Sequence, residues 1–175
     1  MAIGSEKLNS NYSIKDYIRF LVGDKDSSLF SDKELTFIIE DHLGTQAQSS
    51  GVVLTSNTAG TVYRRTSCRT PVYLTSIYED ATDVTDNSGV FVQEGPFLKV
   101  SFDTAPTGTV TATFYKVDFP RTMRDIYLAI ASDKVKVSVF QSFGDITIDQ
   151  STLEQQLRQK AYHWQGISSP VFKRL

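Results

Sequence analysis

The stretch FPRTMRDIYLAIASDKVKVSVFQSFGDITIDQSTLEQQLRQKAYHW, residues 119–164, changes its hydrophobic period twice and thereby organises the expected fold. In its first part the apolar residues recur at the three-and-four spacing of one helical face. They are Phe119, Met123, Ile126, Tyr127 and Ile130. Pro120 stands near the first turn of this helix, where a missing N–H costs nothing. We therefore expect a helix whose apolar face packs on a neighbouring element.

The middle of the stretch predicts a short β-hairpin. Apolar and polar residues alternate there with the period of two that is typical of strands. The apolar members are Val135, Val137 and Val139 before the break at Phe143-Gly144-Asp145, and Ile146 and Ile148 after it.

Three predicted helices begin with a capping box, in which a serine is followed three residues later by an acidic residue. The pairs are Ser13 with Asp16, Ser31 with Glu34, and Ser151 with Glu154. Glycines 23, 44 and 166 follow the apolar runs and are expected to end these helices. The predicted apolar faces consist of Ile14, Tyr17, Ile18, Leu21 and Val22 in the first helix, Leu35, Ile38, Ile39 and Leu43 in the second, and Leu153, Leu157, Ala161 and Trp164 in the last.

Between these helices the composition shifts to Thr, Ser, Val, Tyr and Gly, which favours strands. Alternating runs separated by turn residues predict strands at Gly51–Thr55, Thr61–Arg65, Val72–Tyr78, Val90–Gln93, Leu98–Phe102 and Thr109–Val117. The predicted fold class is therefore α+β. Residues 1–44 and 118–175 form a small helical bundle with the short hairpin, and residues 45–117 form an inserted all-β module, a sandwich or a small barrel.

Composition limits the function classes. The chain of 175 residues has 18 Lys and Arg against 20 Asp and Glu, a net charge of −2, so no overall field draws it to nucleic acid or anionic lipid. Its single cysteine, Cys68, excludes an intramolecular disulfide. No run approaches the length of a membrane span, and the N-terminus lacks the apolar stretch of a signal peptide, so we expect no membrane partner and no export.

The sequence offers little catalytic machinery. Neither His42 nor His163 has the partner spacing of a zinc site, and no nucleophile elbow or phosphate-binding loop occurs. The acidic run YEDATDVTDNSG, residues 78–89, fails the register of a calcium loop, so we interpret it as a solvated loop with at most a weak metal site. We expect no catalytic residues, no cofactor and no bound metal.

Two groups of basic residues are candidates for contacts with another subunit or with the DNA backbone. The first comprises Arg64, Arg65 and Arg69, although Arg64 and Arg65 point oppositely on a strand. The second includes Arg158 and Lys160 on the last helix. A protein–protein contact explains this second group as well as DNA does.

Two strings resemble the head–tail connector (head-completion, or adaptor) proteins of long-tailed bacteriophages. They are YIRFLVGDKDSSLFSDKELTFIIEDHL, residues 17–43, and VKVSVFQSFGDITIDQSTLEQQLRQKA, residues 135–161. In that family a Gly-Asp linker precedes a Ser-Asp-x-Glu helix start, and a strand, a Gly-Asp turn and a second strand precede the final helix. The β-rich segment departs from the compact family pattern, and we interpret it as an insertion.

The resemblance implies a structural virion protein of the neck, made in the host cytoplasm, and not an enzyme. It implies a ring of twelve copies beneath the portal protein, which extends the DNA channel and meets a stopper or tail-completion protein on its other side. Double-stranded DNA would pass through without sequence-specific contact, along a neutral to acidic lining. No predicted helix carries a second continuous apolar face, so we expect the purified protein to be monomeric or weakly associated until the portal templates the ring.

Two alternatives stay open. The chain is another neck or tail-completion protein, or its β module binds a carbohydrate or receptor through tyrosines at 63, 73, 78 and 115. The positions of these tyrosines in the fold, in the core or on the surface, distinguish the two.

The C-terminal segment is expected to be an arm that reaches the portal. Gly166 and Pro170 end the helical pattern, and the following residues combine apolar and basic side chains, as in segments that order on binding. The predicted contact residues are Ile167, Val171, Phe172, Lys173, Arg174 and Leu175.

Overall fold

The computed structural model describes residues 11–24, 26–65, 71–95, 98–143 and 149–166, and the side chains among them except at 45–50, 142, 143 and 166. The chain is an α+β protein that divides into two compact units. The β unit comprises Met1–Tyr17 and Leu43–Val117, and the helical unit comprises Ile18–His42 and Asp118–Leu175. The fold class therefore agrees with the prediction from the sequence.

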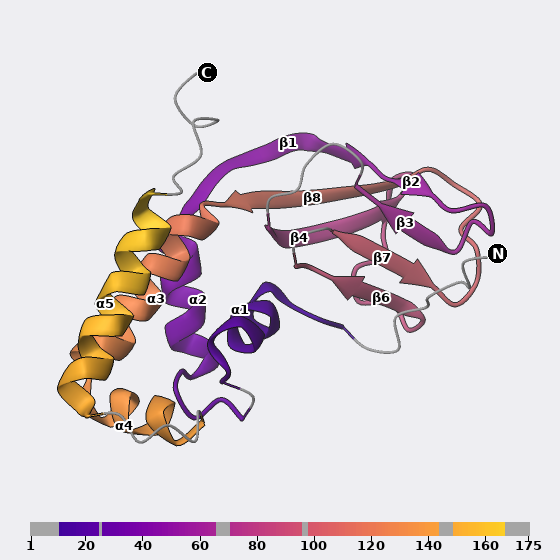
Figure 1. The fold of residues 1–175 in the computed structure, drawn as a ribbon. Coiled ribbons are helices and arrows are strands. Elements are labelled where there is room, and N and C mark those ends of the chain that lie inside the picture. Colours follow the sequence, from indigo (N-terminus) through magenta and orange to yellow (C-terminus); the bar gives the residue numbers. More distant parts are fainter. Residues whose placement is uncertain (1–10, 25, 66–70, 96–97, 144–148, 167–175) are drawn as a thin grey trace. The chain divides into compact units, whose positions relative to one another are not determined.

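The β unit contains two four-stranded antiparallel sheets (Figure 1). The first has the order β1-β8-β4-β5 and the second the order β2-β3-β7-β6. The strands are β1 (Leu43–Val53), β2 (Thr55–Ser56), β3 (Val62–Arg64), β4 (Val72–Glu79), β5 (Thr82–Asp83), β6 (Val90–Gln93), β7 (Lys99–Phe102) and β8 (Val110–Val117). Five of the six predicted strands are present. The predicted strand Gly51–Thr55 instead covers the end of β1 and the start of β2, which lie in different sheets, and the long start of β1 and the two-residue β5 were not anticipated.

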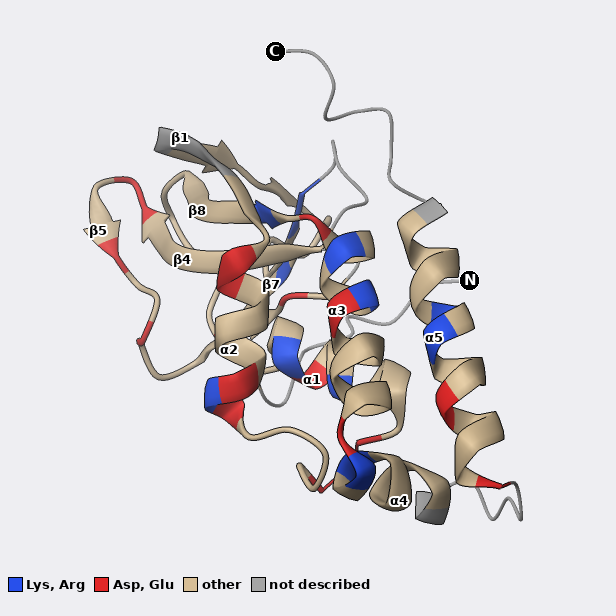
Figure 2. Cartoon of the chain, turned by 90° about the vertical axis from the view of Figure 1, so that its left-hand side faces the viewer, with Lys and Arg blue, Asp and Glu red and all other residues tan. Residues whose placement is uncertain are grey.

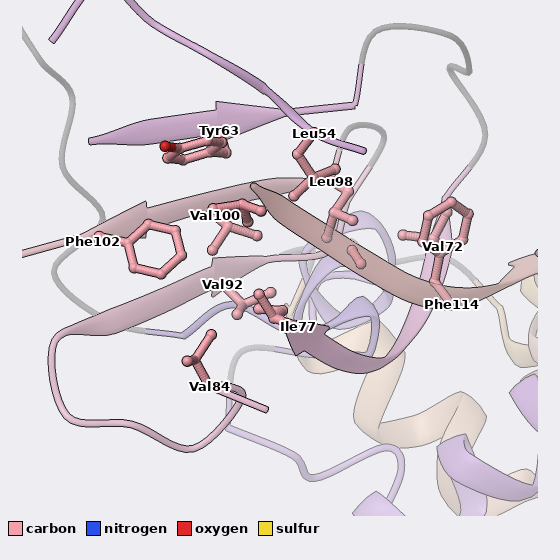
Figure 3. Close-up of a cluster of buried hydrophobic side chains, with 12 residues drawn as sticks. Leu54, Tyr63, Val72, Ile77, Val84, Val92, Leu98, Val100, Phe102 and Phe114 are labelled. Atoms are coloured by element: carbon pink, nitrogen blue, oxygen red, sulfur yellow. The ribbon is translucent and has the colours of Figure 1, made fainter. Parts of the chain in front are cut away.

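Side chains from both sheets form one hydrophobic core, as in a sandwich (Figure 3). Phe114 of β8, Ile77 of β4 and Val100 of β7 are fully buried in it. The ring of Tyr63 packs edge-on against Phe102, with the centroids 5.5 Å apart. The alternation of buried and half-buried residues along β8 reproduces the period of two on which the strand prediction rested.

The segment that leads into the first helix belongs to the β unit, whereas the predicted helical core began at residue 1. Tyr12 forms a parallel bridge with Gln93 of β6: its N–H donates to the Val92 carbonyl and its own carbonyl accepts from Glu94 N–H, both at 2.8 Å. The Glu94 carboxylate also accepts the N–H of Ile14 at 2.8 Å. These hydrogen bonds link Tyr12 and Ile14 to β6 and to Glu94, the residue after it, and local sequence patterns did not indicate them.

Five helices are present in the described residues: α1 (Ile14–Val22), α2 (Asp32–Asp41), α3 (Phe119–Ser132), α4 (Lys134–Phe143) and α5 (Gln150–Gly166). In the helical unit α3 packs against α5, α4 and α2, and α2, α3 and α5 lie side by side (Figure 1). The five apolar residues predicted for the face of α3 are all buried. Trp164 of α5 meets the Phe119 ring edge-on, with the centroids 5.9 Å apart.

The first two capping boxes are confirmed. Asp16 Oδ2 accepts the Ser13 N–H at 2.8 Å, and the Ser31–Glu34 box starts α2. Gly23 ends α1 with φ +80°, and the N–H groups of Gly23 and Asp24 bond back to Phe20 and Arg19 as in a Schellman motif.

The expected end of the second helix at Gly44 is wrong. The helix α2 ends at Asp41, and β1 begins at Leu43, so the residue predicted on the apolar helix face starts a strand instead. The N–H of Asp118 donates to the His42 carbonyl at 3.0 Å, and Leu43 pairs with Val117. The chain therefore leaves and rejoins the helical unit at adjacent points, as expected for an inserted module.

The predicted hairpin is also wrong in the part that the structure describes. Val135, Val137 and Val139 lie in the helix α4. Asp133 caps this helix by accepting the N–H of Val135 at 2.9 Å. Val137 is fully buried, whereas Val135 is 71% exposed. The apolar residues that alternate in the sequence therefore do not all lie on one buried face. The second predicted strand, Ile146 and Ile148, lies outside the described residues.

The last helix starts earlier than predicted. Gln150 is the first residue of α5, and Leu153 N–H bonds to the Asp149 carbonyl at 3.0 Å. Ser151, the expected cap, lies inside the first turn, where its hydroxyl bonds the Asp149 carboxylate. The predicted face of this helix is confirmed, because Leu153, Leu157 and Ala161 are buried.

Candidate functional site

A groove of about 370 Å³ lies in the helical unit among α2, α3 and α4. Its lining is almost entirely apolar and consists of Phe30, Lys33, Glu34, Phe37, Ile38, Ala129 and Lys136. The lining residues of α2 and the residue that precedes its N-cap follow the three-and-four spacing of one helical stripe. They are Phe30, Lys33, Glu34, Phe37 and Ile38. Phe37 is 75% exposed at its edge, which is unusual for an aromatic side chain without a partner. The stripe joins Ile38, which belongs to the predicted apolar face of this helix, to Phe37, which the sequence analysis did not place on it.

Lys136 of α4 fixes one wall of the groove. Its ammonium donates to the Leu29 carbonyl and to Glu34 Oε1 at 2.8 Å, and it lies 4.1 Å from the centroid of the Phe30 ring. The side chain is only 16% exposed. The hydrogen bond from Lys136, together with those from Ser31, lowers the pKa of Glu34 to about 2. Lys136 therefore ties α4 to α2 and to the loop before it.

The loop before α2 holds Phe30 in place at the groove. The buried Asp24 carboxylate accepts the N–H groups of Leu29 and Phe30 at 2.9 and 3.2 Å. Arg19 donates to the Phe30 carbonyl at 3.0 Å and pairs with Asp32 at 2.7 Å. Both polar groups of the Phe30 backbone are thus bonded, so this wall is preformed rather than created on binding.

A second polar cluster joins α2 to α3. Nε2 of His42, the C-cap of α2, lies 2.7 Å from Asp125 Oδ2, and Arg124 Nε donates to the other oxygen at 2.6 Å. Burial opposes the ionisation of Asp125, but the bonds from Arg124 and His42 outweigh it, so the pKa of this carboxyl lies below its usual range. His42 is thus a C-cap with a mostly buried ring. The pair therefore joins the C-terminal end of α2 to α3.

The basic residues predicted to contact DNA or another subunit do not form one patch. Arg65 is buried, and its guanidinium lies 4.3 Å from the centroid of the Phe114 ring, so it belongs to the β core rather than to a surface. Arg64 is exposed, and Arg69 lies outside the described residues. Arg158 and Lys160 are exposed on α5, with the Lys160 ammonium 5.8 Å from the Tyr127 ring centroid.

The start of the acidic run forms hydrogen bonds with the loop that precedes β8. Glu79 accepts the N–H groups of Thr107 and Gly108 at 2.7 and 3.0 Å, and Asp80 accepts that of Thr109 at 2.9 Å. Figure 2 shows acidic residues on the turns beside β5. Among the described residues no group of three His, Cys, Asp or Glu is placed to hold a metal ion, so the weak metal site considered above has no support.

The tyrosines of the β unit fall in two places. Tyr63 belongs to the core, whereas Tyr73 and Tyr115 face each other across β4 and β8 and are half-buried. Along β8 the core residues alternate with residues that point away from the core, and Thr111 and Tyr115 belong to the second kind. Tyr78 pairs with Thr111 and therefore lies on the same face as Tyr73 and Tyr115. Three of the four tyrosines therefore lie on the outer face of the first sheet.

Cys68 and the predicted portal-contacting arm, Ile167 to Leu175, lie outside the described residues. Within the part of the chain that is described, no helix is long and apolar enough to span a membrane.

Comparisons with protein families, with curated proteins and with solved structures find no match.

Proposed function

We propose that this chain is a structural protein of the bacteriophage neck, a head–tail connector that joins a ring of copies to the portal protein. The observation that carries the proposal is the construction of the helical unit. It has two capped helices before the long β segment and the helices α3 and α5 after it, and these four follow the order implied by the resemblance to the connector family. The helix α4 departs from that resemblance, because a strand was expected in its place.

The surface of the helical unit supports a role in assembly. It carries a preformed apolar groove and exposed aromatic side chains, which in a soluble protein mark sites of protein contact. Both basic and acidic residues occur on its described helices (Figure 2), and such a mixture of charges would hold passing DNA only weakly. In this proposal the β unit is an addition to the connector, and the copies contact the portal on one side and a stopper or tail-completion protein on the other.

Complementation in a phage that encodes this chain tests the proposal. Removing the gene should give DNA-filled heads and complete tails that stay separate, and adding the purified protein to such lysates should restore infectious particles. The proposal would be contradicted if particles without this protein still joined heads to tails. It would also be contradicted if the added protein bound the heads and the tails stayed unjoined.

A second candidate function rests on the outer face of the first sheet. The cross-strand pair of Tyr73 and Tyr115, beside Tyr78 and a row of hydroxyl side chains, resembles the exposed aromatic residues over polar groups that bind glycans. A glycan array with the purified protein tests this function. Signals that disappear in Tyr115→Ala and persist in a Thr82→Ala control would favour it, and the absence of any signal would exclude the glycans on the array.

A further inference from the structure

The helical unit carries two uncovered apolar features on different helices. One is the groove edged by Phe37 of α2. The other is a pair of adjacent side chains on α1, Phe20 with 69% and Leu21 with 37% of its surface exposed. The buried face of α1 consists instead of Ile14, Ile18 and Val22. Phe20 and Leu21 therefore project from the helix while the groove is concave.

We propose that the Phe20–Leu21 pair of one copy docks in the α2–α3–α4 groove of the next copy, giving a head-to-tail contact. A contact between two different surfaces of the same chain is heterologous and continues from copy to copy, as a ring requires. An isologous contact of either feature with itself would leave the other uncovered. This inference rests on the proposed ring and identifies which surfaces of the helical unit form it.

The chemistry of the two surfaces agrees with this pairing. The groove is apolar where an aromatic ring would enter, and its polar groups at Lys136 and Glu34 already bond each other, so little desolvation opposes entry. The Phe30 wall is held by Asp24 and Arg19 before any partner arrives. A preformed acceptor loses little conformational freedom when it binds.

The size of the contact explains why the copies would not associate firmly alone. One aromatic side chain buries about 150–250 Å². With Leu21 the contact stays far below the roughly 800 Å² per partner of a stable interface. We therefore infer that this contact is weak in free solution and becomes effective when a template such as the portal holds many copies side by side.

Disulfide trapping between separately prepared variants tests the pairing. In a Cys68→Ser background, Leu21→Cys and Lys33→Cys are placed in different chains, which are mixed under oxidising conditions. Both sites are exposed and lie in or beside the proposed contact, and the changes leave Phe20 and Phe37 in place. The mixture should give cross-linked heterodimers at least about tenfold faster than a Leu21→Cys and Gln155→Cys mixture, the factor expected for one well-placed aromatic contact.

Charge variants supply a second readout that does not depend on cysteines. Phe20→Arg and Phe37→Arg should each abolish the weak self-association that we expect of the unchanged protein at high concentration. A mixture of the two variants should form heterodimers and nothing larger, since one intact pair of surfaces remains. Cross-linking that favours like pairs, or equal rates in the control mixture, would overturn the proposal. Because purified protein is used, these outcomes are independent of whether the chain lies in the virion neck.

Discussion

Replacing Lys136 by methionine tests how the helical unit is held together. The substitution keeps most of the aliphatic stem but removes the ammonium that bonds the Leu29 carbonyl and Glu34 and lies over the Phe30 ring. A hydrogen bond from a charged donor contributes about 1.5–3 kcal/mol. A half-exposed ion pair contributes at most about 1 kcal/mol and the cation–π contact about 0.5–1 kcal/mol.

Part of this gain is offset, because ordering a lysine side chain costs about 1.5–2 kcal/mol. We therefore expect Lys136→Met to lower the free energy of unfolding by about 2 kcal/mol, or the melting temperature by about 4–8 °C. Urea denaturation followed by far-ultraviolet circular dichroism measures the change. Lys134→Met is the matched control, because that exposed lysine lies on the same helix, and it should change stability by less than about 0.5 kcal/mol.

The pH dependence separates the ion pair from the other contacts. The folded-state pKa of Glu34, about 2, is below its ordinary value of 4.5. The stability that this carboxylate contributes is therefore fully present above pH 4.5 and is lost as the pH falls towards 2. The cost of Lys136→Met should shrink over that interval without vanishing, because the Leu29 carbonyl and the Phe30 ring do not titrate. A cost below about 0.5 kcal/mol, or one independent of pH, would refute this account of α4.

Four further predictions concern other parts of the chain. His42→Ala should lower the free energy of unfolding, measured by urea denaturation, by about 1–3 kcal/mol, because Asp125 loses a hydrogen bond. An equal loss in an Asp125→Asn background would show that the contact between the two residues does not contribute to stability. Burial raises the pKa of Glu94, so the folded state binds the proton more tightly and wild-type stability should fall, relative to Glu94→Gln, as the pH rises above 4.5; a constant difference would contradict this. Replacing Gln46–Lys116 by a short Gly/Ser linker should leave a soluble helical protein, and an aggregated product would count against an independent helical unit. Deleting Ile167–Leu175 should leave the melting temperature nearly unchanged but abolish attachment to portal-bearing heads; normal occupancy by the truncated protein would exclude the arm.

The sequence predicted best what local chemistry decides. The Ser31–Glu34 box and Gly23 act through atoms a few residues apart, so their signals survive in any tertiary context. The strands of the β unit were predictable because turn residues separate runs in which every second side chain is buried.

The failures arose where distant contacts override local preference. Valines at 135, 137 and 139 favour a strand, but they lie in α4, where Lys136 bonds Leu29 and Glu34 and Val137 is fully buried. Asp133, the cap of this helix, was the available signal. Glu94 and Asp125 bond residues about eighty positions away in the sequence, and no spacing rule connects them to Ile14 and His42. The groove was missed for the same reason, because its walls come from three helices.

Imaging the neck of the virion with this protein labelled tests the central proposal most directly. A tag can replace the exposed residues Asp86–Ser88 in the turn before β6 without disturbing either core. Averaged cryo-electron micrographs should show the tag as a ring of density at the junction of head and tail, next to the portal. Label on the capsid, along the tail or at the tail tip, or no label on intact particles, would contradict the connector proposal.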